Sequence, residues 1–260
     1  MAPEAWAVAL FRRSVLKQRK LAEIERLLGP TGGRRCLDLG SDNGVISLML
    51  RRGGGDWASA DLTAEAVASI RELVASDVHL VSEDHLPFPD GAFDCVAVVD
   101  MLEHVRNECA FVSELARIMR PGARLVVNTP HLRDTPLRRL RERIGLTDEK
   151  HGHVRPGYTA EGLRALLDAS GRFSWNGHRT YSRAFSETID LAINWGIARL
   201  GKEHSAKGMV VTGRDVLRHR NAFRAFAVVY PAIRAFSSLD QLIPWAPGYM
   251  LIASANRLGS

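Results

Sequence analysis

The chain of 260 residues has only three cysteines, an odd number. Cys36 and Cys95 lie in apolar segments where buried thiols are common, so we expect no disulfide and a reducing compartment, the cytoplasm. Long apolar runs are also missing, because arginine or lysine interrupts each one before the about 20 residues that span a bilayer. The N-terminus lacks the basic-then-apolar order of a signal peptide. Neither a transmembrane nor a secreted protein is therefore expected.

What is present begins with residues 35–44, Arg-Cys-Leu-Asp-Leu-Gly-Ser-Asp-Asn-Gly, before a helix-forming segment at 45–52. The apolar residues of 36–39 predict a buried parallel strand, and Gly40 and Gly44 allow a sharp turn close to a ligand. A second strand ends in Asp61, about 20 residues beyond Gly40, where a carboxylate can bind ribose hydroxyls. This layout predicts a nucleotide-cofactor site.

Strands and helices continue to alternate after this unit. The segment 82–94, Ser-Glu-Asp-His-Leu-Pro-Phe-Pro-Asp-Gly-Ala-Phe-Asp, precedes a strand at 95–99 and the polar segment Asp100-Met-Leu-Glu-His104. Further elements are predicted as follows: helix 108–119, strand 124–128, helix 160–169 with Thr159 as its N-cap, and strands 172–180 and 248–255. Such alternation predicts the α/β class with a mostly parallel sheet.

The Leu-Pro-Phe, Phe-Asp and Glu-His-Val signatures within residues 86–105 carry a specific resemblance. The chain resembles the class I methyltransferases that use S-adenosyl-L-methionine, of the methyltransferase type 11 kind, over about residues 33–181. That resemblance implies a Rossmann-like, seven-stranded, mostly parallel sheet with helices on both faces. It also implies S-adenosyl-L-methionine as the cofactor.

The resemblance places the cofactor on several loops of this chain. Asp38, Gly40 and Gly44 would surround its methionine part, and Asp61 would hold its ribose. The family usually has glycine where this chain has Asp42, and aspartate where it has Ser82, so Glu83 or Asp84 becomes a candidate for the adenine side. The expected cofactor-binding residues are Asp38, Gly40, Ser41, Asn43, Gly44, Asp61, Leu62, Ser82, Glu83, Asp84, Asp100 and Met101.

Candidate catalytic residues are histidines at predicted strand ends. Methyl transfer is a direct displacement, so a base is needed only if the acceptor must lose a proton. We predict His131 and His104 for this role, with His153 as a third candidate, although each also fits a structural role. Arg155 could bind a carboxylate or phosphate of the acceptor, and Tyr158 could close over it. No metal site is predicted: a group of His131, His151 and His153 lacks a cysteine pair or carboxylate at ligand spacing.

The organisation predicted is an N-terminal amphipathic helix over 1–32, a core over 33–185 and 245–260, and a helical insertion over 186–244, before the last strand.

The net charge of +6 is concentrated in basic amphipathic segments. They comprise Arg12, Arg13, Lys17, Arg19, Lys20 and Arg26; the segment 133–143; and Arg214, Arg218, Arg220 and Arg224. Such segments bind anionic membranes or acidic ligands, form dimer contacts, or pack internally, and the sequence leaves these alternatives open. The insertion is placed to build the acceptor pocket, to add a packing layer, or to contact a membrane or a second copy.

The predicted function is methyl transfer from S-adenosyl-L-methionine to a small-molecule acceptor, anionic or linked to a lipid or glycan. The expected location is the cytoplasm, with peripheral attachment to the inner membrane face as one alternative. A cofactor-binding protein without catalysis and an RNA-directed methyltransferase are the other candidates. Nucleic acid is not favoured, because no RNA-binding module is recognisable and Asp100-Met-Leu-Glu103 is not the Asn/Asp-Pro-Pro-aromatic signature of base-amine methylation. The Gly-x-Gly-x-x-Gly pattern of nicotinamide-dependent dehydrogenases is missing as well.

Overall fold

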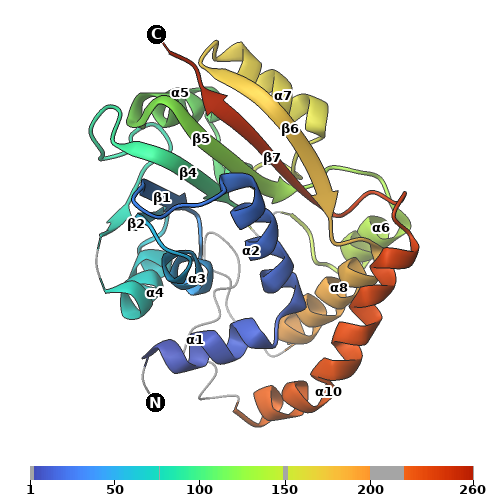
Figure 1. Cartoon of the computed structure of the whole chain (residues 1–260). Coiled ribbons are helices and arrows are strands. Elements are labelled where there is room, and N and C mark those ends of the chain that lie inside the picture. The colour runs from blue at the N-terminus through green and yellow to red at the C-terminus, as the bar shows by residue number, and fades with distance from the viewer. Residues whose placement is uncertain (1–2, 76, 149–151, 200–219, 260) are drawn as a thin grey trace.

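The computed structural model describes residues 3–75, 77–148, 152–199 and 220–259. Its centre is a seven-stranded sheet of order β3-β2-β1-β4-β5-β7-β6 with helices on both faces (Figure 1). All neighbouring strands are parallel except β7, which runs antiparallel between β5 and β6. The strands are β1 (Arg35–Leu39), β2 (Asp56–Asp61), β3 (Val78–Leu80), β4 (Phe93–Val99), β5 (Met119–Pro130), β6 (Phe173–Tyr181) and β7 (Met250–Arg257). The predicted Rossmann-like, mostly parallel sheet is confirmed.

Helices connect the strands and extend the core at one side. They are α1 (Pro3–Arg12), α2 (Val15–Leu28), α3 (Val45–Arg52), α4 (Ala64–Val74), α5 (Glu108–Ile118), α6 (Pro136–Arg143), α7 (Ala160–Ala169), α8 (Ala184–Arg199) and α10 (Arg220–Ser238), with short 3₁₀ turns η1 (Leu102–His104) and η3 (Leu239–Leu242). Among the described residues, no helix has the length and apolar character needed to cross a membrane.

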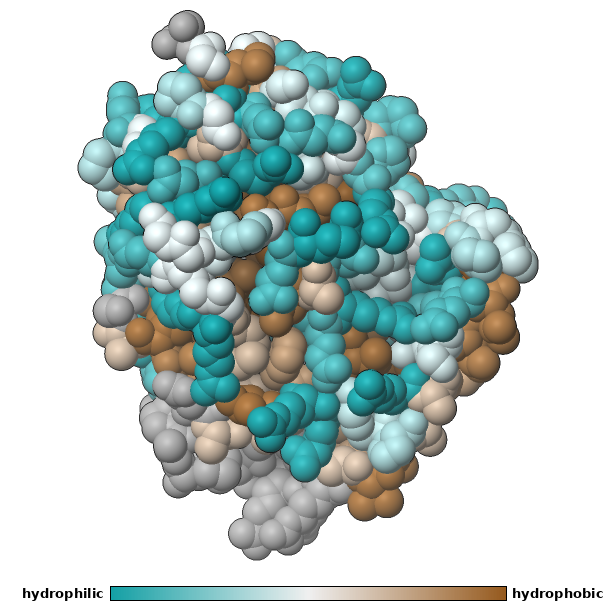
Figure 2. Space-filling view, viewed as in Figure 1, coloured by the Kyte–Doolittle hydropathy of each residue, from teal (hydrophilic) through white to brown (hydrophobic). Residues whose placement is uncertain are grey.

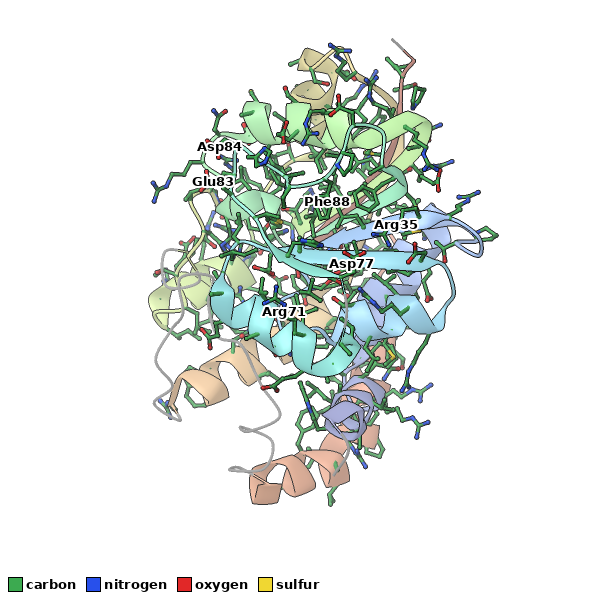
Figure 3. All side chains as sticks on the ribbon, turned by 90° about the vertical axis from the view of Figure 1, so that its left-hand side faces the viewer. Arg35, Arg71, Asp77, Glu83, Asp84 and Phe88 are labelled. Carbon is green, nitrogen blue, oxygen red and sulfur yellow. The ribbon has the colours of Figure 1, made fainter. Side chains whose placement is uncertain are left out.

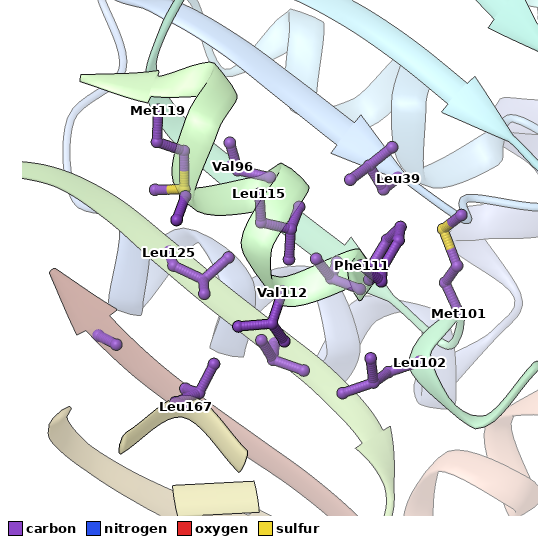
Figure 4. Packing of buried hydrophobic residues seen from close by; sticks show 14 of the residues in the cluster. Leu39, Val96, Met101, Leu102, Phe111, Val112, Leu115, Met119, Leu125 and Leu167 are labelled. Carbon is purple, nitrogen blue, oxygen red and sulfur yellow. The ribbon is translucent and has the colours of Figure 1, made fainter. Parts of the chain in front are cut away.

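The alternation of side chains along each strand produces two cores. Leu37 and Leu39 of β1 pack toward α5 and α7, in a cluster that includes Phe111 (Figure 4). Cys36 faces the opposite side and packs with residues of α2 and α3 such as Ile24. Both faces are apolar because parallel strands are covered on both sides.

The sheet reverses its strand order between β1 and β4, which are neighbours although two strands separate them in the chain. In open α/β sheets a ligand binds in the crevice at the carboxyl ends of the strands at such a switch point. The loops after β1, β2 and β4 meet at this edge, and they carry the predicted cofactor residues.

The N-terminal region differs from the single helix predicted over 1–32. It forms two helices, because the side chain of Ser14 accepts a hydrogen bond from the Lys17 backbone N–H at 3.3 Å and starts α2 anew. Trp6 of α1 and Leu21 of α2 are buried in the same cluster as the α3 side chains. The apolar stripe of this region therefore packs inside the protein, which is one of the alternatives that the sequence left open.

Helix α2 lies across the sheet and contacts β4, β5 and β7 (Figure 1). Between β6 and β7 the chain forms α8, α10 and η3, and α8 contacts both α6 and α10. Ion pairs tie this layer to the rest of the protein: Arg19 to Asp240 at 2.6 Å, Arg133 to Glu187, and Arg141 to Asp190. The side chains of Arg214, Arg218, Arg220 and Arg224, predicted to form a basic cluster, lie outside what the structure describes.

Candidate functional site

The turn between β1 and α3 is built on residues with positive φ. Gly40 has φ of 90° and Gly44 has φ of 77°. Asp42, which stands where the resembled family usually has glycine, has φ of 55°, a conformation that aspartate tolerates better than most residues. Ser41 Oγ is buried and has no hydrogen-bond partner among the described residues. An unsatisfied buried hydroxyl in this turn suits a polar group of a bound cofactor.

The Asp38 carboxylate lies beneath this turn and is fully buried. Ser47 Oγ donates to it at 2.8 Å and Ser59 Oγ at 2.6 Å, while Arg51 lies 3.4 Å away. Asp38 therefore joins β1 to α3 and β2, and it positions the turn. Its predicted direct contact with the cofactor stays a prediction.

Asp61 ends β2 beside the turn, and it is fully buried. The backbone N–H of Asp42 lies 3.4 Å from one of its carboxylate oxygens and that of Thr63 lies 3.4 Å from the other. Both contacts are long for hydrogen bonds that involve a carboxylate. Asp61 is thus held at the switch point, and the partly buried Leu62 follows it against the α5 core.

Figure 3 labels Glu83 and Asp84 in the segment after β3, which the resemblance assigns to the adenine side of the cofactor. Ser82 Oγ donates to Asp84 at 2.9 Å, and both residues are exposed. The Glu83 carboxylate accepts the backbone N–H of Arg106 at 2.7 Å, so it anchors the start of the α5 region. The predicted contact of Ser82, Glu83 or Asp84 with the cofactor stays a prediction.

Asp100 follows β4 with φ of 45° and forms an ion pair with Lys20 of α2. Its other carboxylate oxygen accepts from Asn128 Nδ2 at 2.7 Å, and Tyr181 Oη donates to Asn128 Oδ1 at 2.6 Å. Four elements, α2, β4, β5 and β6, thus meet in one polar network. Met101, the next residue, is fully buried beneath it.

The sequence left open whether Lys17 and Lys20 face a membrane, a ligand, a second copy or the interior, and the structure brings them to the sheet edge. Burial and neighbouring Lys20 lower the pKa of Lys17, against the pull of Asp42 and Asp100. Burial opposes the charge of Lys20, yet attraction and hydrogen bonding by Asp100 raise the pKa of Lys20 above its ordinary value. The signal that could have shown this is the spacing of three residues, which puts both lysines on one side of α2.

Asp190 of α8 and Tyr249 complete this part of the site. Burial raises the pKa of Asp190, although Arg141 and Lys20 attract its charged form. Burial, followed by the charge of Asp190, raises the pKa of Tyr249. The side chains of Asp100, Lys20, Arg141 and Asp190 nevertheless keep 19–32% of their surface exposed. Seven polar side chains thus gather at this edge, and we call them the polar cluster: Lys17, Lys20, Asp100, Arg141, Tyr181, Asp190 and Tyr249.

His131 follows β5 and lies at the same edge as these groups. Its Nδ1 is 2.9 Å from the Gly248 carbonyl, and its backbone N–H donates to the Tyr249 carbonyl at 2.9 Å. Burial lowers the pKa of His131 below its ordinary value, the Gly248 carbonyl opposes this, and Arg133 lowers it further. The imidazole is therefore neutral at pH 7, as a base must be before it takes a proton.

His104 of η1 and His153, from the segment that follows α6, lie together. Their rings are 4.8 Å apart, edge to face, and His104 Nδ1 is 3.0 Å from the Gly152 carbonyl. Glu103 is buried beside them, and its Oε2 accepts from Thr129 Oγ1 at 3.2 Å. The structure thus groups Glu103, His104 and His153, whereas the sequence analysis considered His131, His151 and His153. His151 lies outside the described residues.

Arg155 and Tyr158 are engaged with helix α5. Both bond the Glu108 carboxylate, and Arg155 also donates to Tyr158 Oη at 2.6 Å. Burial, then the bond to Glu108, raises the pKa of Tyr158 above its ordinary value. This network holds the segment 152–158 against η1 and α5. The predicted contact of Arg155 and Tyr158 with the acceptor stays a prediction.

A seven-stranded sheet of this order, with a glycine turn after β1 and a buried acid after β2, defines the class I S-adenosylmethionine-binding fold. The family described as methyltransferase domain matches residues 11–171. The chain belongs to this methyltransferase family, whose cofactor is S-adenosyl-L-methionine. Three features of the site fit S-adenosyl-L-methionine: the unsatisfied Ser41 hydroxyl, the turn with positive φ, and the position of Asp61 at the end of β2.

Curated relatives match the chain over a shorter stretch. Demethylmenaquinone methyltransferase of Beutenbergia cavernae is 39% identical over 102 residues, which cover 38% of this chain and 42% of the relative. Ubiquinone biosynthesis O-methyltransferase of Xylella fastidiosa is 36% identical over 106 residues, covering 38% and 43%. The chain therefore aligns with less than half the length of these relatives.

Solved structures match nearly the whole chain at low identity. The [4+2]-cyclase SpnF superposes with a TM-score of 0.62 and 19% identity, over 94% of this chain and 82% of the cyclase. Geranyl diphosphate C-methyltransferase from Streptomyces coelicolor A3(2), solved with Mg²⁺ and S-adenosyl-L-homocysteine, has a TM-score of 0.58 and 14% identity, over 94% and 77%. These similarities show the fold.

Proposed function

We propose that the chain transfers a methyl group from S-adenosyl-L-methionine to a small-molecule acceptor bound beside the polar cluster. The observation that supports this most is the cluster itself. It lies near the loops after β1 and β4, which carry predicted cofactor residues, and the side chains of Lys20, Asp100, Arg141 and Asp190 keep 19–32% of their surface exposed. An acceptor there would reach the carboxyl edge of the sheet, and the bound cofactor would supply an activated methyl group.

The acceptor that fits best is anionic or linked to a lipid or glycan. The polar cluster holds three basic side chains, Lys17, Lys20 and Arg141, against the two carboxylates of Asp100 and Asp190, and the partly buried Tyr249 supplies aromatic surface. The two curated relatives are named for demethylmenaquinone and for ubiquinone biosynthesis, which supports a lipid-linked acceptor for this chain too.

The role of this chain's residues is mainly alignment. Lys20 and Asp100 fix α2 against the end of β4, and Asp61 fixes the cofactor end of the site. The neutral imidazole of His131 is available to take a proton from a hydroxyl or amine acceptor. The cover of α2 and α8 keeps bulk water from the reacting atoms.

The test is incubation of the purified protein with an isotopically labelled donor and fractionated cell extract, followed by mass spectrometry. Label in the lipid or small-molecule fraction supports the proposal and names the acceptor. Label in RNA supports the RNA-directed alternative. Donor binding in calorimetry without transfer to any fraction supports the non-catalytic alternative. His131→Ala should lose transfer, while His79→Ala, a partly exposed imidazole on β3 beside Asp77, should keep it.

We further propose that α10 and η3 rest on an anionic membrane at the inner face, where a lipid-linked acceptor would be delivered. Val228, Leu242 and Trp245 expose 80%, 66% and 79% of their surface, which is unusual for such side chains. Apolar residues gather at the right-hand and lower edge of the molecule, where α10 lies (Figure 2). Arg12 and Arg13 line a hollow with Tyr230 of α10, so basic charge adjoins this surface.

A further inference from the structure

The group formed by the buried Glu103 and the partly buried His104 and His153 has no part in the proposed transfer. One ligand atom from each of the three residues lies within 4.8 Å of the others. Two come from η1, directly after β4, and the third from the segment after α6. Long-range folding therefore assembles the group, since 48 positions separate His104 from Gly152, which adjoins His153.

The two imidazoles have the relative placement that a shared ion requires. Metal–nitrogen bonds of about 2.1 Å at tetrahedral or octahedral angles put two ring centres about 5 Å apart. The centres of His104 and His153 are 4.8 Å apart, with the rings nearly perpendicular at 87°. Glu103 is only 1% exposed, so its carboxylate is close to the rings and shielded from water.

An outer contact orients the His104 ring in the way seen at metal sites. Metal-binding histidines donate their second ring N–H to a carbonyl or carboxylate. His104 Nδ1 is 3.0 Å from the Gly152 carbonyl oxygen. His153 Nδ1 lies 3.6 Å from Asp148 Oδ1, which is beyond hydrogen-bond distance but close enough for the carboxylate to act on the ring. Thr129 fixes the Glu103 carboxylate by a hydrogen bond of 3.2 Å.

We propose that Glu103, His104 and His153 bind one divalent transition-metal ion. Two nitrogens and one carboxylate oxygen suit Zn²⁺, Co²⁺, Mn²⁺ or Fe²⁺, whereas Mg²⁺ and Ca²⁺ prefer oxygen ligands alone. A buried carboxylate beside two imidazoles gains a compensating positive charge when the ion binds. Three protein ligands leave coordination positions for water or for another small molecule.

The site joins two segments that the bonds of Arg155 and Tyr158 to Glu108 already hold together. The Val154 backbone N–H donates to the Glu103 carbonyl at 2.9 Å, and the ion would add a further link between η1 and the segment 152–158. Because η1 follows Asp100 and Met101, the ion would fix the loop on the cofactor side of β4. Metal binding and donor binding remain separate measurements, so the site can be tested whether or not the chain transfers methyl groups.

The experiment titrates the purified, metal-stripped full chain with Co²⁺, followed by visible absorption, and with Zn²⁺ in competition with a chelating dye. We expect one ion per chain, with Zn²⁺ displacing Co²⁺ and excess Mg²⁺ displacing neither. Glu103→Gln, His104→Ala and His153→Ala should each weaken binding about 100-fold or more, because even outer-contact changes cost about 10–100-fold. Asp148→Asn changes only an outer contact, so it should weaken metal binding about 10–100-fold.

His178→Ala, an exposed imidazole on β6, is the matched control and should bind as the parent does. Glu103→Gln keeps the shape and the bond to Thr129, and circular dichroism with donor titration checks that each variant folds. Binding that is the same in the parent and in all three ligand variants would overturn the proposal, as would failure of the parent to bind Zn²⁺ more tightly than Mg²⁺.

Discussion

Lys20 of α2 and Asp100 at the end of β4 form an ion pair across the edge where the cofactor loops meet. The pair joins α2 to the end of β4 within the polar cluster. Both partners are mostly covered, and Asn128 supplies the second bond to Asp100. Removing the lysine leaves a carboxylate with one fewer partner in a site of low exposure.

Lys20→Met should therefore lower the free energy of unfolding by about 1–3 kcal/mol at pH 8. The pKa of Lys20 is raised in the folded state. Its contribution is thus fully present below the ordinary lysine value of about 10.4 and is lost as pH rises through the folded pKa. Urea unfolding at pH 8 and at pH 11 should show the difference between parent and variant shrinking. An equal difference at both pH values would contradict this linkage.

Asp61→Ala should weaken binding of S-adenosyl-L-methionine by about 1–3 kcal/mol, because ribose hydroxyls would lose a charged partner. Isothermal titration calorimetry measures the change. Asp56→Ala, at the exposed start of the same strand, is the control and should bind the donor unchanged. Equal affinities for the two variants would remove Asp61 from the cofactor site.

His131→Ala should lower turnover about 10²-fold with little change in donor affinity if the imidazole is the base. The folded pKa of His131 is lowered. The folded state therefore takes up a proton less readily than the unfolded chain, so the penalty is absent above about pH 6.5 and grows as pH falls below it. Urea unfolding of parent and His131→Asn at pH 7.5 and 5.5 should show the parent losing more stability. Turnover within a few-fold of the parent would assign His131 a structural role.

Gly44→Ala should destabilise the fold by more than Gly122→Ala. Both glycines have positive φ, 77° and 81°, so alanine is strained at either. At Gly44 the added Cβ would also stand 2.8 Å from the Ile70 Cα, whereas at Gly122 it would meet nothing within 4 Å. We expect about 1 kcal/mol at Gly122 and about 2–4 kcal/mol at Gly44 by urea unfolding. Similar losses would show that α4 moves aside easily.

If the surface formed by α10 and η3 binds a membrane, the protein should sediment with vesicles that contain anionic lipid, and added salt should release it. Val228→Asp and Trp245→Ala should each reduce the bound fraction several-fold, because they remove exposed apolar surface. Leu80→Ala, an exposed apolar side chain on β3, is the control. Failure of the parent protein to sediment with these vesicles at low salt would contradict the membrane proposal.

Most of the fold could be predicted from local signals in the sequence. Gly40 and Gly44 adopt the positive φ that their spacing suggested, and Thr159 caps α7 as predicted. The break at Ser14 was missed, because apolar periodicity runs through it, although serine is itself a helix-start signal. Helix periodicity reports which residues share a face of a helix. It does not show that the chain forms two helices, α1 and α2, separated at Ser14.

The site was predictable only where one segment supplies it. Asp61 follows its own strand, so its position at the sheet edge could be inferred from the chain order. Lys20, Arg141 and Asp190 meet because α2, α6 and α8 pack over that edge, and no spacing in the sequence encodes such a contact. The same holds for Glu103 and His153, which a loop after α6 brings together.

Tyr181 at the end of β6 pairs directly with Met250 at the start of β7. The whole segment between them therefore leaves the sheet and returns to it at one point. A tight turn could join the two strands there without altering the register of any other strand. The region between β6 and β7 is thus a replaceable module, and under the proposed function acceptor choice can change in evolution while the cofactor-binding scaffold stays the same.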